Sequence, residues 1–163
     1  MFEKFCGYVN KDKLMIMVAN LNSSICKFYF YNKSLSQLTL GKTLEHEQSR
    51  EKNSELSSDK QGHYKSNTSN RGAYSPHLEP KEVEILTFVR EISRGLDQFR
   101  NNHLFDSLII IAPAHVSGVL HKHINKNVKD LVSHHISKDL VKISDKDLLK
   151  FLKENIVFEK YTK

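Results

Sequence analysis

The chain opens with three short apolar runs of the length of β-strands. Leu14 to Leu21 is apolar almost throughout, Ile25 to Tyr31 is rich in aromatic residues, and Leu35 to Leu44 alternates imperfectly. β-Branched and aromatic residues favour strands, and Asn22-Ser23-Ser24 is typical of a turn. We therefore expect the first two runs to form a hairpin, to which the third run adds a strand.

Helical spacing begins at Pro80, a residue suited to a first helical turn because its missing N–H needs no partner there. Apolar residues then recur every three or four positions as far as Phe99, and Asn101-Asn102-His103 ends the pattern. The stripe consists of Val83, Leu86, Val89, Ile92, Leu96 and Phe99, widened by Ile85 and Phe88. This spacing predicts one long amphipathic helix.

The remaining third of the chain alternates between strand and helix signals. Phe105 to Ala112 contains a continuous Leu-Ile-Ile-Ile run, which predicts a strand buried on both faces at the centre of an α/β sheet. Val116 to Ile124 predicts a helix. Val128 to Val141 fits helix or strand, and we expect a helix end followed by a strand. Ser144 is a candidate N-cap for a last helix, with Asp147 as its acidic partner.

The order β-β-β-α-β-α-β-α predicts a mixed α/β sheet with helices packed on it, and it is compatible with a ribonuclease H-like arrangement. A length of 163 residues indicates one domain, residues 1–163, interrupted by a long polar loop at about 45–78. Two cysteines are too few for a disulfide framework. We expect Cys26, which lies in an apolar run, to be a small buried hydrophobic residue.

Charge and hydropathy indicate which partners and which compartment suit the protein, but they do not indicate an activity. The formal net charge is +6, and residues 119–163 contain ten lysines against six acidic residues. Such a balance suits RNA or another anionic partner, but the lysines are interleaved with acids, as on an ordinary solvated surface. No apolar run reaches the length of about 20 residues that spans a bilayer, and the first residues lack a secretory pattern. We expect a soluble, cytoplasmic protein.

The residues alone indicate no catalytic centre, cofactor or metal site. Nucleotide-binding glycine motifs and G-x-S-x-G are absent from the sequence. His121-x-His123 and the adjacent pair His134-His135 lack the spacing of zinc ligands on one face of an element. His115, directly after the predicted central strand, is better placed for function than the other histidines, although a solvated histidine at a helix start is the simpler interpretation.

Several ordered segments resemble the bacterial host-attachment protein family, whose members are required for attachment to host cells. V-A-N-L-N-S-S-I-C-K-F at 18–28 resembles the opening "V-A-D-x-x-x-A-x-x-F", and S-D-K-Q-G-H at 58–63 resembles "S-D-x-P-G-R". The resemblance continues through L-E-H-E at 44–47, R-G-A-Y at 71–74, E-P-K-E-V-E at 79–84, F-V-R-E-I at 88–92, F-D-S-L-I-I-I-A-P at 105–113, the turn at Gly118 and K-D-L at 138–140. It covers roughly residues 14–152.

The resemblance implies a fold similar to the ribonuclease H-like central domain of archaeal and eukaryotic peptide-chain release factors. It also implies that the polar stretch is a recurring loop and not a random spacer. The chain departs from the family pattern in having Asn20 for a common Asp, Gln61 for Pro and His63 for Arg. Release factors hydrolyse peptidyl-tRNA with a Gly-Gly-Gln tip, and this loop offers only Gln61-Gly62, which argues against that reaction.

The candidate binding residues that follow are Asp59, Gly62, His63, Arg71 and His115. In the loop, Asp59 is a brace or a site residue and Gly62 supplies a turn with positive φ, while His63 and Arg71 are candidates for phosphate contacts. Solvated loop positions are the alternative for both.

Three functional hypotheses remain. The favoured one is a binding module that is not an enzyme and that recognises a protein partner during attachment. The second is a factor that binds the ribosome or tRNA, and the third is a hydrolase with a site near Asp59, His63 and His115.

Overall fold

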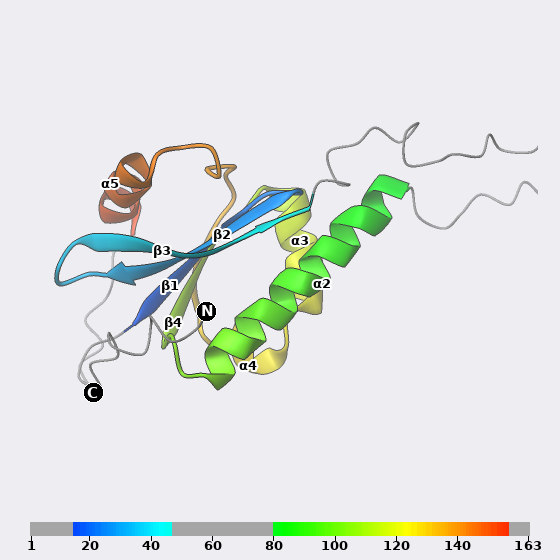
Figure 1. Ribbon diagram of the computed structural model, residues 1–163, viewed down its shortest axis with the longest axis horizontal. Helices are drawn as coiled ribbons and strands as arrows, with labels where there is room; N and C mark the ends of the chain where they lie inside the picture. Colours follow the sequence, from blue (N-terminus) through cyan, green and yellow to red (C-terminus); the bar gives the residue numbers. More distant parts are fainter. Residues whose placement is uncertain (1–14, 47–79, 157–163) are drawn as a thin grey trace, which may run out of the picture.

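A mixed β-sheet with helices on both faces forms the body of the protein (Figure 1), as seen in a computed structural model that describes residues 15–46 and 80–156. Its strands are β1 (Ile16–Leu21), β2 (Ile25–Asn32), β3 (Gln37–Glu45), β4 (Ser107–Ile111) and β5 (Val132–Ile136). The helices of the described residues are α2 (Pro80–Asn101), α3 (Ala114–His123), α4 (Lys126–Lys129) and α5 (Asp145–Asn155).

The strands lie in the order β3-β2-β1-β4-β5. β1, β2 and β3 are antiparallel neighbours, whereas β1, β4 and β5 run parallel to one another. The antiparallel pairs need only short turns, while each parallel strand is reached through a helical crossover, α2 before β4 and α3–α4 before β5. The mixed α/β architecture predicted from the sequence is therefore confirmed. The likeness to ribonuclease H in particular stays a prediction.

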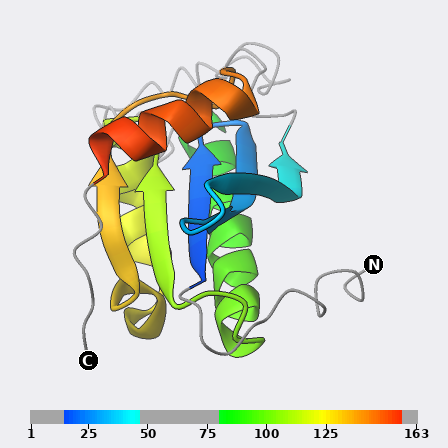
Figure 2. The ribbon, with the colours of Figure 1, turned by 90° about the vertical axis from the view of Figure 1, so that its left-hand side faces the viewer.

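Two helical layers cover the sheet, as Figures 1 and 2 show: α5 lies on one face, and α2, α3 and α4 lie on the other. Successive side chains of a strand point to opposite faces, so a strand between two layers must be apolar at every position. In β1, Met17 and Ala19 belong to the core beneath α2 and α3, while Ile16 and Val18 belong to the core beneath α5. This explains the continuous apolar runs in β1 and β4.

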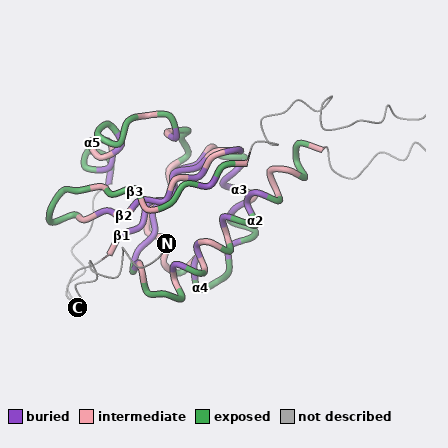
Figure 3. The backbone as a smooth tube through the Cα atoms, viewed as in Figure 1, coloured by how far each residue is buried: buried purple, intermediate pink, exposed green. Residues whose placement is uncertain are grey.

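The long helix α2 packs its apolar stripe on the sheet and leaves its other side to solvent (Figure 3). Phe88, Ile92 and Leu96 are fully buried, and the ring of Phe99 meets that of Phe28 in an edge-to-face contact with centroids 5.2 Å apart. Aromatic pairs favour this geometry. The packing fixes the rotation of α2, and with it the direction in which the polar residues of the helix point.

Four predicted starts differ from the structure by two residues. β1 begins at Ile16 instead of Leu14 and β4 at Ser107 instead of Phe105, and the starts of β3 and α3 also differ. β3 begins two residues later than predicted, because residues 33–36 form the turn, with Ser36 at φ 49°. α3 begins at Ala114, two residues earlier than predicted, directly after Pro113. The mixed signals of residues 128–141 resolve into the end of α4 followed by β5, as expected.

Two local predictions are also confirmed. Ser144 caps α5, because its hydroxyl oxygen accepts a hydrogen bond from the backbone N–H of Asp147 at 3.2 Å. Cys26 is buried, and burial, followed by the charge of Glu91, raises the pKa of its thiol. The predicted polar loop at about 45–78 lies outside the described residues, except for its first two positions.

Candidate functional site

The sequence-predicted binding residues are not brought together within the described part of the chain. Asp59, Gly62, His63 and Arg71 lie outside the described residues. His115 lies in the first turn of α3 and is exposed, which agrees with a solvated histidine at a helix start. The binding roles of all five residues, and the hydrolase site built from three of them, stay predictions.

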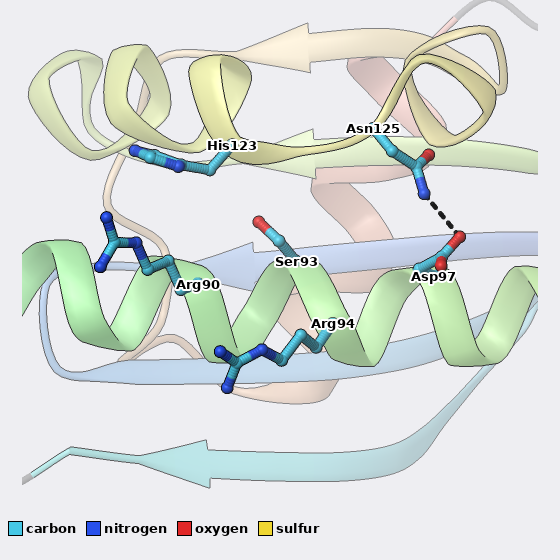
Figure 4. Close-up of a pocket in the computed structure, with 6 residues that line it drawn as sticks. All are labelled: Arg90, Ser93, Arg94, Asp97, His123 and Asn125. Carbon is cyan, nitrogen blue, oxygen red and sulfur yellow. Dashed lines mark hydrogen bonds between the residues drawn. The ribbon is translucent and has the colours of Figure 1, made fainter.

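A polar groove of about 250 Å³ lies between α2 and the chain that joins α3 to α4 (Figure 4). Arg90, Ser93, Arg94 and Asp97 line it from α2, and His123 and Asn125 line it from the opposite side. The four α2 positions are spaced by three, four and seven residues, which places them along one side of a helix. A seven-residue separation corresponds to about 10 Å along the helix axis, so the groove has two distinct ends.

One end of the groove is closed by a hydrogen bond between Asn125 and Asp97. The side-chain amide of Asn125 donates to Asp97 Oδ1 at 2.6 Å, and its own oxygen accepts from the backbone N–H of Val128 at 2.8 Å. Asn125 is thus both the N-cap of α4 and the link from α4 to α2. This double contact fixes the connection after α3 against the long helix.

The carboxylate of Asp97 is held ionised by these neighbours. The hydrogen bond from Asn125 and then that from Arg100 lower its pKa, since both stabilise the charged form. Arg100 donates to Asp97 Oδ1 through Nε at 3.0 Å and through a terminal nitrogen at 2.9 Å. Because Arg100 offsets the charge of Asp97, this end of the groove is close to neutral.

The other end of the groove is cationic. Figure 4 shows Arg90 and His123 facing each other from opposite walls, while Arg94 extends along α2. Within residues 15–46 and 80–156, neither arginine has a carboxylate partner. Two neighbouring positive charges repel, and an anion between them would relieve that repulsion. Ser93 lies between the two ends, with its hydroxyl proton donated to the Val89 carbonyl at 2.9 Å.

A second polar position lies at the carboxyl end of β1, where the chain has Asn20. Its side chain is only 1% exposed, and its amide donates to the Leu140 carbonyl at 2.9 Å. Nearby, Asn22 donates to Asp139 at 3.3 Å, and Lys27 donates to the Val141 carbonyl at 3.1 Å. These contacts tie the segment between β5 and α5 to the sheet, which is a structural role.

The described residues contain no group of three or more His, Cys, Asp or Glu side chains that could hold a metal ion. Ser117 of α3 and His135 of β5 are hydrogen-bonded to each other, but Ser117 is buried, so the pair joins a helix to an edge strand. None of the helices in residues 15–46 and 80–156 is long and apolar enough to cross a membrane.

The groove was not predicted from the sequence, because the prediction for residues 80–101 rested on the apolar stripe and gave no role to the polar positions between its members. Two signals were available: the spacing of Arg90, Ser93, Arg94 and Asp97, and the Asn at position 125 before a short helix. What the sequence did not indicate was that residues 123–125 pack beside α2. That proximity arises from the α2–α3 packing on one face of the sheet.

Comparison with known proteins agrees with the resemblance seen in the sequence. The chain is similar to an archaeal translation termination factor, aRF1, with a TM-score of 0.48 and 8% identity over 86% of this chain, and it spans 38% of the length of that protein. No curated protein matches the chain. The model of the family described as "Protein required for attachment to host cells" matches residues 15–152. The chain therefore belongs to this host-attachment family.

Proposed function

We propose that this member of the host-attachment family acts by binding a partner and not by catalysis, and that the groove between α2 and the α3–α4 connection is its binding surface. The observation that carries the proposal is the cationic end of the groove, where Arg90 and Arg94 have no carboxylate partner among the described residues. Guanidinium groups bind carboxylates and phosphates through paired hydrogen bonds, so the partner presents an anionic group.

The test removes the two charges and measures attachment. In a strain that lacks the protein, wild-type protein and the double variant Arg90→Ala, Arg94→Ala are produced at equal levels, and adherent cells are counted on a host-cell layer. The expected result is that only the wild-type protein restores attachment. Both arginines are exposed, and Ala favours helix, so the fold should survive the change.

A matched control separates the groove from net charge. The double variant Lys146→Ala, Lys153→Ala also removes two positive charges, but from exposed positions of α5, which covers the opposite face of the sheet. This variant should restore attachment as the wild-type protein does. If the arginine variant also restores full attachment, the groove is not the binding surface in that process.

The second candidate function is binding to the ribosome or to tRNA. Arg90 and Arg94, which have no carboxylate partner within residues 15–46 and 80–156, favour it because arginine is a common phosphate ligand. The lysine excess of residues 119–163 adds a favourable general charge. Co-sedimentation with ribosomes across a salt series tests this function. Binding should fall steeply with salt and be weaker for the arginine variant than for the lysine variant. Absence of sedimentation at low salt would refute it.

A cytoplasmic location is part of this proposal, since the partner of a ribosome-binding factor is inside the cell. Fractionation followed by immunodetection tests it. The protein should be found with the cytosolic markers, and recovery of the mature protein at the cell surface would contradict this location.

A further inference from the structure

Positive charge that is not offset by a carboxylate of the described residues lies at one end of the groove only. Arg90 and His123 face each other at that end, and Arg94, which also lines the groove, extends along α2. At the other end, the charge of Asp97 is offset by Arg100 at 2.9 Å. Between the ends, the proton of Ser93 is committed to Val89, so its hydroxyl presents only lone pairs. An anion is therefore attracted to one defined place and not along the whole groove.

The donors of the cationic end lie on two walls, which favours a tetrahedral anion. Arg90 and Arg94 belong to α2, and His123 is the last residue of α3. A phosphate group has oxygens in several directions and can accept from both walls at once, while a planar carboxylate matches a single guanidinium. The charge agrees as well, since a phosphate monoester carries about −1.5 to −2 at pH 7 and the two guanidinium groups carry two positive charges.

We infer that the Arg90–Arg94–His123 end of the groove binds a terminal phosphate group, the phosphomonoester of a ligand, an inference that rests on the proposed binding function of this groove. A continuous phosphodiester chain is a poorer match. It would extend a second phosphate toward the lone pairs of Ser93 and the carboxylate of Asp97, and among the described residues no Lys or Arg lines the groove at that end. The phosphomonoester comes either from a small phosphorylated molecule or from the 5′ end of an RNA.

The experiment is a titration of the full-length, ¹⁵N-labelled protein followed by NMR at constant ionic strength. The probes are glycerol 2-phosphate as a monoester, dimethyl phosphate as a diester and a poly-glutamate peptide. The monoester should shift the signals of α2 and of residues 121–125 with saturation, and the diester should bind at least about tenfold more weakly. Arg90→Ala should weaken monoester binding roughly tenfold or more, as expected for loss of a charge-assisted hydrogen bond.

Controls and alternative outcomes separate this inference from the proposed function. Lys146→Ala, Lys153→Ala should leave the monoester affinity unchanged, and Arg90→Lys should recover part of it. If the peptide binds through Arg90 and the monoester does not, the phosphate inference is wrong while the proposed binding function stands. Equal affinity for monoester and diester would also overturn the inference.

A pair of RNA decamers identifies the source of the phosphate. Tighter binding of the 5′-phosphorylated decamer than of its unphosphorylated form supports an RNA end as the ligand. Saturable binding of glycerol 2-phosphate with equal, weak binding of the two decamers supports a small phosphorylated molecule. Monoester binding that persists unchanged in Arg90→Ala, Arg94→Ala would place the phosphate elsewhere and refute the site.

Discussion

The buried amide of Asn20 allows a quantitative test of the packing at the carboxyl end of β1. Asn20→Asp keeps the shape of the side chain but replaces the amide that donates to the Leu140 carbonyl by an oxygen. At 1% exposure a carboxylate facing a carbonyl is strongly disfavoured, so the introduced carboxyl should stay neutral in the folded protein. In the unfolded chain the pKa of this carboxyl is about 3.9, which is about 3.1 units below pH 7. Each unit corresponds to about 1.4 kcal/mol, so keeping the carboxyl neutral in the folded protein at pH 7 lowers the free energy of unfolding by roughly 4 kcal/mol.

The sign of the pH dependence follows from the same argument. A carboxyl whose folded pKa is raised costs nothing below its unfolded pKa of about 4, and its cost grows by about 1.4 kcal/mol per pH unit above that. Urea unfolding followed by circular dichroism between pH 4 and pH 8 measures it as the difference between variant and wild-type protein. Asn127→Asp, at an exposed position of α4, serves as the control and should show no such slope. Wild-type stability of Asn20→Asp at pH 7, or a loss independent of pH, would refute the reasoning.

Three further changes test other parts of the fold by the same unfolding assay. Burial, and then the hydrogen bond to Asp145, raise the pKa of Tyr29, so the wild-type protein should lose stability as the pH rises above about 10. Tyr29→Phe should reduce this loss at high pH, and at pH 7 it should lower the free energy of unfolding by about 1 kcal/mol because the hydrogen bond is lost. Gly41→Ala should destabilise by about 1–3 kcal/mol, because a Cβ there would lie 2.6 Å from the Phe30 ring, and unchanged stability would contradict that contact. Gly118→Ala, in α3 with nothing within 4 Å of the added Cβ, should instead stabilise by about 0.5–1 kcal/mol, and a loss would show a contact that the structure lacks.

The strands and helices of this fold could be predicted where burial imposes a simple pattern. β4 is buried on both faces, so its Leu-Ile-Ile-Ile run is continuous, and α2 is buried on one side, so its apolar residues recur every three or four positions. The boundaries depended on local geometry that the pattern does not encode. The turn with Ser36 at positive φ delayed β3, and the helix after Pro113 began without a capping side chain.

The role of Asn20 shows where a sequence comparison and a structure differ in what they reveal. The resemblance identified Asn20 as a departure from a common Asp, but it did not indicate what the side chain of Asn20 contacts. In the structure the residue is buried, and its amide holds the segment before α5 through the Leu140 carbonyl. A carboxylate could not donate that bond, and a carboxyl group could donate it only when protonated, so at neutral pH the Asn suits this packing better than an Asp.

The groove could not be predicted because its two walls are joined only by tertiary packing. The polar positions of α2 are visible in the sequence, yet α2 has many polar positions, and only those beside residues 123–125 line a groove. The hydrogen bond from Asn125 to Asp97 holds the two walls together at one end of the groove. At the other end of the groove, Arg90 and His123 face each other. The same Asn also caps α4, so the stability of that short helix and the width of the groove depend on one side chain. Arginines that would be ordinary solvated residues on an isolated helix thereby line a groove in which Arg90 faces a histidine on the opposite wall, and this arrangement suits them to hold an anion.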